Sequence, residues 1–140
     1  MSTEETRQLA HKYLDVLNRV LRTGEVDLLD GIGTADFIEH GGGVGLASWK
    51  QNVAGSRSIF PDSQLIATAI LADGDKAAIH ATLRGTHLGD GLGMPPTGKE
   101  ISIDIVDIVR FQDGMAVERW AVGDEMGMMR QLGLIPEPGA

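Results

Sequence analysis

The sequence predicts an α+β domain in which helices come first and an antiparallel sheet follows. Apolar side chains recur at three- and four-residue spacing in the first sixty residues, which is typical of amphipathic helices. From Asp62 onward the pattern changes to alternating segments rich in Ile and Val, separated by turns that contain glycine. Helices followed by strands, rather than alternating with them, favour α+β over a parallel sheet.

The chain length fits one domain. It has 140 residues, of which 42% are hydrophobic, enough for a single core. No internal repeat or linker divides it, so we expect one domain over residues 1–140. The last five residues, 136–140, carry two prolines and a glycine and are expected to form a flexible tail.

The first half predicts three helices. One apolar stripe consists of Leu9, Tyr13, Val16, Leu17, Val20 and Leu21. Ser2 and Glu5 fit a capping box before this helix, and Gly24 suits the left-handed residue that ends it. A shorter helix is expected over Val26 to Ile32. A third helix is expected over Leu46 to Phe60, and Pro61 should end it. The segment between them, Ala35 to Gly45, is rich in glycine and is expected to be a loop.

The second half predicts four strands in a meander. Their expected ranges are Gln64 to Ala72, Lys76 to His87, Glu100 to Gln112 and Met115 to Val122. Asp73-Gly74-Asp75 and Asp113-Gly114 are strong turn sequences. Residues Leu88 to Lys99 hold glycines and prolines and are expected to form a loop. A short helix should follow the last strand and end at Gly133. A curved sheet of this kind, wrapped around helices, would enclose a cone.

Composition excludes several classes of protein. The chain has 20 acidic and 12 basic side chains, which gives a net charge of -8. The excess of acidic residues is spread over both halves of the chain, so nucleic-acid binding is not expected. It contains no cysteine, which rules out disulfides and thiolate chemistry. No apolar run is long enough for a membrane span, and the acidic N-terminus is not a secretory signal, so we expect a cytoplasmic protein.

Sequence signatures of common sites are also missing. No phosphate-binding glycine loop and no GxSxG nucleophile motif occurs in the chain. The four histidines form no HxxxH or HExxH pair, so no metal site is expected.

Two carboxylates interrupt the most apolar strand. Asp104 and Asp107 lie three residues apart, so alternation puts them on opposite faces of the sheet. One of them must face the core or a pocket, and the pattern leaves open which. A buried carboxylate needs a partner, for which Arg84, Arg110 and Arg119 are candidates, or it has a function.

A third carboxylate, Asp124, follows the fourth strand. It shares the parity of Trp120, and an apolar wall beside it would stabilise its protonated form, which suits proton transfer. The alternative is that Asp124 caps the helix that begins at Glu125. His40 lies beside three glycines, from where it could reach a pocket mouth or remain exposed. Tyr13 is the sole phenol and thus the single candidate for a tyrosine oxyanion site.

The chain resembles a known family along almost its whole length, from about Glu4 to Leu134. The segments that carry the resemblance are Phe60-Pro61-Asp62, Gly85-Thr86-His87-Leu88-Gly89, Pro95-Pro96-Thr97-Gly98-Lys99, Asp107-Ile108-Val109-Arg110-Phe111, Glu118-Arg119-Trp120, Asp124 and Gln131-Leu132-Gly133. As a set they resemble the SnoaL-like polyketide cyclases. The resemblance implies the nuclear-transport-factor-2-like cone, a strongly curved antiparallel sheet whose pocket is closed by N-terminal helices.

The resemblance also implies a chemistry. These cyclases close a ring of a polyketide ester by an intramolecular aldol condensation without a metal or organic cofactor. By resemblance, Asp124 would be the general acid/base and His40 would line the pocket and assist it. Other candidates for binding a small hydrophobic carbonyl substrate are Trp49, His80, His87, Asp104 and Trp120.

Two functional alternatives stay open at this point. One is a non-catalytic module that binds a small molecule, and the other is an isomerase or dehydratase on the same fold. Under every alternative we expect a homodimer, because an open curved sheet of this kind usually covers its convex face with a second copy.

Overall fold

The computed structural model of the protein describes residues 1–139. Its helices are α1 (Thr3–Thr23), the short 3-10 helix η1 (Val26–Gly31), α2 (Leu46–Ile59) and α3 (Glu125–Gln131). Its strands are β1 (Gly33–His40), β2 (Gly43–Val44), β3 (Gln64–Asp73), β4 (Lys76–Thr86), β5 (Glu100–Gln112) and β6 (Met115–Gly123). The strands form one sheet in the order β2-β1-β6-β5-β4-β3. The expected α+β class and curved sheet are confirmed. The end of the expected tail, residue 140, lies outside the described residues.

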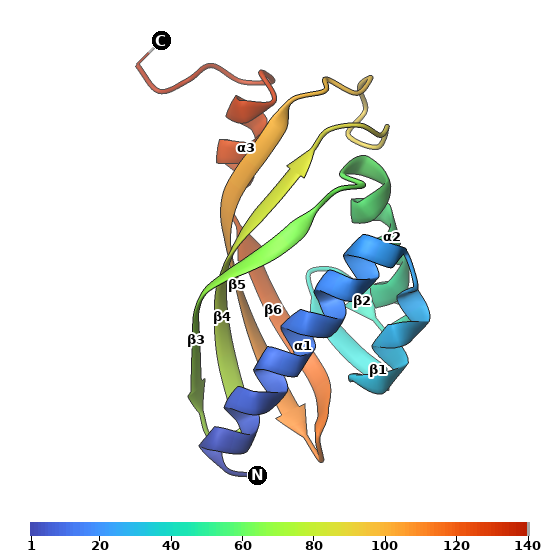
Figure 1. The fold of residues 1–140 in the computed structure, drawn as a ribbon, viewed down its shortest axis with the longest axis vertical. Coiled ribbons are helices and arrows are strands. Elements are labelled where there is room, and N and C mark those ends of the chain that lie inside the picture. The colour runs from blue at the N-terminus through green and yellow to red at the C-terminus, as the bar shows by residue number, and fades with distance from the viewer. Residues whose placement is uncertain (140) are drawn as a thin grey trace.

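Figure 1 shows how the layers are arranged. Helix α1 lies across one face of the bent sheet, α2 lies beside it, and α3 sits at the end of the sheet where the chain finishes. We call the face covered by α1 and α2 the inner face and the opposite one the outer face.

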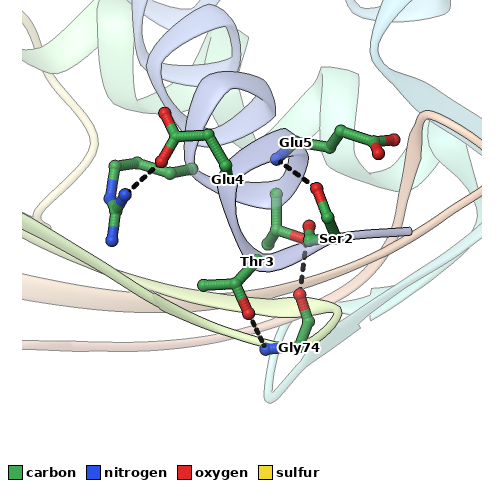
Figure 2. A network of polar contacts seen from close by, with 7 residues as sticks. Ser2, Thr3, Glu4, Glu5 and Gly74 are labelled. Carbon is green, nitrogen blue, oxygen red and sulfur yellow. Dashed lines mark hydrogen bonds and ion pairs between the residues drawn. The ribbon is translucent and has the colours of Figure 1, made fainter.

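Capping residues fix the start of α1. The Ser2 hydroxyl accepts a hydrogen bond from the backbone N–H of Glu5 at 3.1 Å, as the sequence predicts. The Thr3 hydroxyl accepts from the Gly74 N–H at 3.0 Å, and the Thr6 hydroxyl donates to the Gly74 carbonyl. Figure 2 shows these contacts between the first turn of α1 and the β3–β4 turn. The first turn of the helix is therefore bonded to the sheet that it covers.

The segment expected to be a loop, Ala35 to Gly45, is largely strand. Residues 33–40 form β1, which pairs in parallel with β6, and β2 pairs back onto β1. The sheet thus has six strands instead of four, and one of its pairings is parallel. The expectation of a loop was wrong because a strand of mixed burial, with Phe37 inward and exposed polar neighbours, gives no clear alternation. The partner of β1 also lies far along the sequence, where no local pattern can indicate it.

Aromatic side chains form the centre of the core between the helices and the inner face. Trp49 of α2 is fully buried, stacking on Phe37 at 4.3 Å and on Tyr13 at 5.8 Å between ring centroids. Phe111 of β5 meets Tyr13 edge-on at 6.4 Å. Each such ring contributes about 1.5–3 kcal/mol by burial. This packing fixes α1 and α2 against β1 and β5, and so fixes the space left between them.

Candidate active site

A cavity of about 290 Å³ lies between the helices and the inner face. The polar and charged side chains around it are Glu39, Asn52, Ser56, Asp107, Arg119 and Glu125. Its apolar lining comes from Leu17, Leu21, Val53, Leu65, Leu83, Ile105, Ala121 and Val122. The mouth is marked by exposed residues such as Asn52, Ala121 and Glu125, and the floor by the buried Leu17, Val53 and Asp107. An apolar cavity with a few converging polar groups is the usual form of a small-molecule site.

Three charged side chains that line this cavity contact one another. Arg119 of β6 lies between two carboxylates, with Nη1 3.4 Å from Oε2 of Glu39 and Nη2 3.6 Å from Oδ2 of Asp107. The strand register brings them together. Glu39 of β1 pairs with Arg119 of β6, and Asp107 of β5 pairs with Ala121, two residues along β6 from Arg119. We call Glu39, Asp107 and Arg119 the inner triad.

The Glu39 carboxylate is held from the α2 side. Asn52 donates a hydrogen bond from Nδ2 to Oε1 of Glu39 at 2.6 Å and another to the Gly42 carbonyl at 3.0 Å. A Cβ at Gly42 would lie 2.4 Å from Oε1 of Glu39, so a larger residue there would displace this carboxylate. The glycine run therefore lets the β1–β2 turn fold closely over Glu39.

Asp107 has an unusual environment for a carboxylate. Its side chain is 8% exposed, and its Oδ1 atom has no hydrogen-bond partner among the described residues. Burial raises the pKa of Asp107 above its ordinary value, the nearby Arg119 charge opposes that rise, and the Glu39 carboxylate adds to it. A raised pKa brings a carboxyl group closer to the range in which it can both accept and donate a proton.

Tyr13 is buried close enough to the inner triad for all three charges to act on its phenol. Burial raises the pKa of its phenol, which keeps the hydroxyl protonated. That hydroxyl is buried and has no hydrogen-bond partner among the described residues. Tyr13 is absent from the residues that line the cavity, so it supports the triad from the core side.

Small residues leave Asp107 open to the cavity. Ala121 stands opposite Asp107 in the β5–β6 register, and Gly123 follows on the same side of β6. Both line the cavity and both are exposed to solvent. A molecule that enters the mouth can therefore approach the Asp107 carboxylate over a short side chain.

Two of the sequence-predicted site residues, His40 and Trp120, lie together on the outer face. Their rings stack at 4.4 Å with an angle of 3° between their planes. His40 Nε2 is 2.9 Å from Oε2 of Glu118, and the Lys76 ammonium lies 5.5 Å from the Trp120 ring centroid. Neither residue lines the cavity.

A second pair, His80 and Asp104, also lies on the outer face. His80 Nε2 is 3.2 Å from Oδ1 of Asp104, and both side chains are exposed. The question that the pattern left open is answered here: Asp107 faces the cavity and Asp104 faces outward. Of the three arginines named as candidate partners, Arg119 is the one beside Asp107.

Trp49 and His87 are buried away from the cavity. Trp49 belongs to the aromatic core described above. His87 is fully buried, accepts a hydrogen bond from the Thr97 N–H at its Nδ1 atom at 3.2 Å, and packs 5.8 Å from the Phe60 ring. These contacts tie the segment between β4 and β5 to the end of α2.

Asp124 lies at the start of α3, next to the mouth of the cavity. Its Oδ1 atom accepts a hydrogen bond from the Gly127 N–H at 2.9 Å, the capping contact that the alternative interpretation predicts. Its neighbours Gly123 and Glu125 line the cavity. Trp120, expected beside it as an apolar wall, is on the outer face. The catalytic role of Asp124 stays a prediction.

The sequence does carry a signal that Asp107, rather than Asp104, faces inward. Asp107 alternates with Ile103, Ile105, Val109 and Phe111, whereas Asp104 alternates with Ser102 and Arg110. The more apolar of the two sets marks the inner face. Glu39 had no such signal, because its strand was not predicted.

No helix in residues 1–139 has the length and apolarity needed to cross a membrane. No cluster of three or more histidine and carboxylate side chains there is arranged to hold a metal ion.

Comparison with known proteins identifies the family. Residues 9–132 match the SnoaL-like polyketide cyclases. The nogalonic acid methyl ester cyclase of Streptomyces nogalater is 31% identical over 117 residues, covering 79% of this chain and 87% of that protein. The chain belongs to the SnoaL-like polyketide cyclase family.

Solved structures agree with this family. TsrD from Streptomyces laurentii is 25% identical and superposes with a TM-score of 0.82 over 96% of this chain and 99% of that one. IdmH from Streptomyces antibioticus is 25% identical, with a TM-score of 0.76 over 88% and 97% of the two chains. The cone expected from the sequence is therefore the fold of these relatives.

Proposed function

We propose that this protein is a cofactor-independent acid/base enzyme of the polyketide cyclase type, with Asp107 as the group that transfers the proton. The observation that carries the proposal is a buried carboxylate with one unpartnered oxygen, facing an apolar cavity beside a single arginine. The substrate class is a small hydrophobic carbonyl compound, as the apolar lining suits. The cyclase from Streptomyces nogalater, named for a polyketide methyl ester, supports that class.

The proposed step is an intramolecular aldol condensation. Ionised Asp107 accepts a proton from a carbon that flanking carbonyl groups have made acidic, which leaves an enolate. The enolate carbon attacks a second carbonyl carbon of the same molecule, so one carbon–carbon bond forms and one C=O π bond breaks. The new alkoxide then takes the proton back from Asp107. Atoms and charges balance without a redox partner.

Arg119 supplies the fixed positive charge for this step. Its guanidinium lies within 4 Å of Asp107 and stays protonated, so it can stabilise the negative charge that moves onto the enolate oxygen. A water-poor cavity strengthens that attraction. The cavity walls hold both reacting ends of the substrate close together, which contributes much of the rate of an intramolecular reaction.

Asp124 is the competing candidate for the base. The resemblance to the family supports it, and its position beside the mouth places it within the same region as Gly123 and Glu125. Against this, its carboxylate is engaged in capping α3. The two candidates make different predictions for single substitutions.

The test compares three matched variants with nogalonic acid methyl ester as the test substrate. We expect Asp107→Asn to lower kcat/KM by about 10² to 10⁴, the contribution of a general base. Asp104→Asn changes an equivalent carboxylate on the outer face of the same strand and should stay within about threefold of wild type. Asp124→Asn should act through α3 and lower stability by about 1 kcal/mol.

The same variants can overturn the proposal. Full turnover by Asp107→Asn overturns the proposal, and a loss confined to Asp124→Asn makes Asp124 the base. The ester could also raise the melting temperature of the wild-type protein without being converted and without exchanging its activated hydrogen in heavy water. That result overturns the proposal as well. A non-catalytic binding module is then favoured.

We further propose that the protein is a homodimer formed through the outer face. Exposed apolar side chains lie there on neighbouring strands, among them Ile38, Val106 and Ile108. The acidic, cysteine-free composition supports a cytoplasmic location.

Light scattering on the purified protein tests the dimer. The expected mass is twice that of the chain, and Ile108→Glu should halve it without loss of helix signal. A monomeric wild type would overturn this part of the proposal.

A further inference from the structure

We propose that Glu39 is a positioning residue that divides the charge of Arg119 between two carboxylates and thereby keeps Asp107 able to work as a base. The inference rests on the proposed function of Asp107. It assigns a role to a residue on a strand that the sequence did not predict.

Arg119 contacts two carboxylates at once. Its two terminal nitrogens point to different carboxylates, at 3.4 Å for Glu39 and 3.6 Å for Asp107. Neither contact is a short bidentate pair, which is how arginine binds a carboxylate most strongly. Arg119 is therefore shared between the two groups.

Glu39 is also held by a second contact. Its other oxygen, Oε1, accepts a hydrogen bond from Asn52 at 2.6 Å, and the Gly42 backbone leaves room for it. This carboxylate is fixed at one place, on the side of Arg119 away from Asp107. A carboxylate that only balanced charge would not need a second anchor, which Asn52 of α2 provides.

The charged groups around Asp107 show what Glu39 does there. Arg119 of β6 is the positive group, whereas Glu39 of β1 and Glu125 of α3 are the negative ones around the cavity. Tyr13 of α1 faces the triad as a neutral phenol. Without the Glu39 charge, Arg119 would have Asp107 as its one carboxylate partner in the triad. Asp107 would also lose a nearby negative charge. Both changes favour the ionised form of Asp107.

A paired, fully ionised Asp107 would be a weaker base. A carboxylate stabilised by its own arginine holds a proton less tightly, so it removes protons from carbon more slowly. Glu39 thus raises the proton affinity of Asp107 without touching the substrate itself.

The experiment measures the titration of Asp107 directly. We would follow its ¹³C carboxyl signal by NMR in labelled protein without any ligand, in wild type and in Glu39→Gln. The midpoint should fall by about one pH unit in the variant, a roughly tenfold change in the protonation equilibrium. Glu39→Asp, which restores the charge, should recover at least half of that shift.

Glu118→Gln is the matched control. Glu118 also pairs with an arginine, Arg110 at 2.5 Å, but on the outer face of the same strands. Its substitution should leave the Asp107 midpoint within about 0.2 units, because Glu118 lies on the opposite face of the sheet and its charge is neutralised by Arg110. If Glu39→Gln does not fold, Asn52→Ala frees the Glu39 carboxylate from its anchor and should move the midpoint in the same direction by less.

The acid limb of the kcat/KM profile provides the second measurement. With the ester used above, this limb should move to lower pH in Glu39→Gln by the same amount as the NMR midpoint, while the maximal rate falls by about tenfold. An unmoved or raised Asp107 midpoint overturns the role of Glu39. A moved midpoint in a protein whose Asp107→Asn variant is fully active overturns the proposed function but leaves the charge division in place.

Discussion

The inner and outer faces of strands β5 and β6 carry similar residues in very different states. Each face has an acid beside an arginine: Asp107 with Arg119 inside, and Glu118 with Arg110 outside. Outside, the pair is a direct hydrogen bond at 2.5 Å. Inside, the nearest nitrogen and oxygen are 3.6 Å apart and the carboxylate keeps an unpartnered oxygen.

The difference shows that burial and pairing, not residue type, decide how tightly a carboxylate holds a proton. Hydrogen bonds from Arg110 and His40 lower the pKa of Glu118, so this carboxylate is satisfied and stable as an anion. Burial raises the pKa of Asp107 despite its arginine. A satisfied ion pair has little left to offer a substrate, whereas an incompletely paired carboxylate can exchange a proton.

The largest expected contrast is between two tryptophans. Trp49→Ala should lower the free energy of unfolding by about 3–5 kcal/mol, because Trp49 is fully buried in the aromatic core. Trp120→Ala removes a partly exposed ring that stacks on His40 and should cost about 1 kcal/mol. Urea unfolding of both variants checks this, and equal costs would mean that the faces do not differ as described.

The next contrast is between the two arginines. Arg119→Met leaves Glu39 and Asp107 without their cation, and we expect the free energy of unfolding to fall by about 3 kcal/mol. Arg110→Met breaks an ion pair that solvent screens, so the loss should stay below about 1 kcal/mol. A smaller loss for Arg119→Met than for Arg110→Met would show that the inner triad is not a buried charge cluster.

The smallest contrast is in the response to pH. The raised pKa of Asp107 means that its ionisation opposes folding, so Asp107→Asn should gain stability relative to wild type as pH rises from about 4 through the native pKa. The lowered pKa of Glu118 has the opposite sign. Its contribution is present above about pH 4.3 and is lost as pH falls through the native pKa, so wild type should lose its advantage over Glu118→Gln in acid.

Urea titrations of the three proteins between pH 3 and 7 measure these slopes. Slopes of the same sign for both variants would contradict the assignment of Asp107 to a buried site and Glu118 to a satisfied pair.

Local patterns predicted most of the helices and hairpins. The stripe of α1, its Ser2 cap and the turns at Gly74 and Gly114 depend on neighbours a few residues away, and these elements were correctly expected. Strand β1 was missed because its pairing depends on β6, and so Glu39 was missed with it. A site assembled from distant strands is not visible in any window of the sequence.

The orientation of β6 could not be read from alternation. Both sets of alternating residues in this strand contain apolar side chains, and the set with Trp120 was expected to face inward. A bulge intervenes: Arg110 pairs with Glu118 but Phe111 pairs with Ala116, so Val117 is an extra residue. Ala116 and Arg119 therefore share the inner face, and every residue after the bulge is inverted relative to simple alternation.

The parallel pairing of β1 with β6 has a consequence for how this protein folds. His40 and Trp120 are neighbours in the sheet although eighty residues separate them in the chain, whereas every other strand pairing joins consecutive strands. Contacts this distant in sequence form late, because closing so long a loop costs entropy before any contact repays it. On a ribosome, α1, α2 and the strands β3 to β5 emerge before β6 does. The inner triad therefore cannot form until β6 has been made, and a chain that stops before β6 lacks Arg119 and with it the charge that joins Glu39 to Asp107.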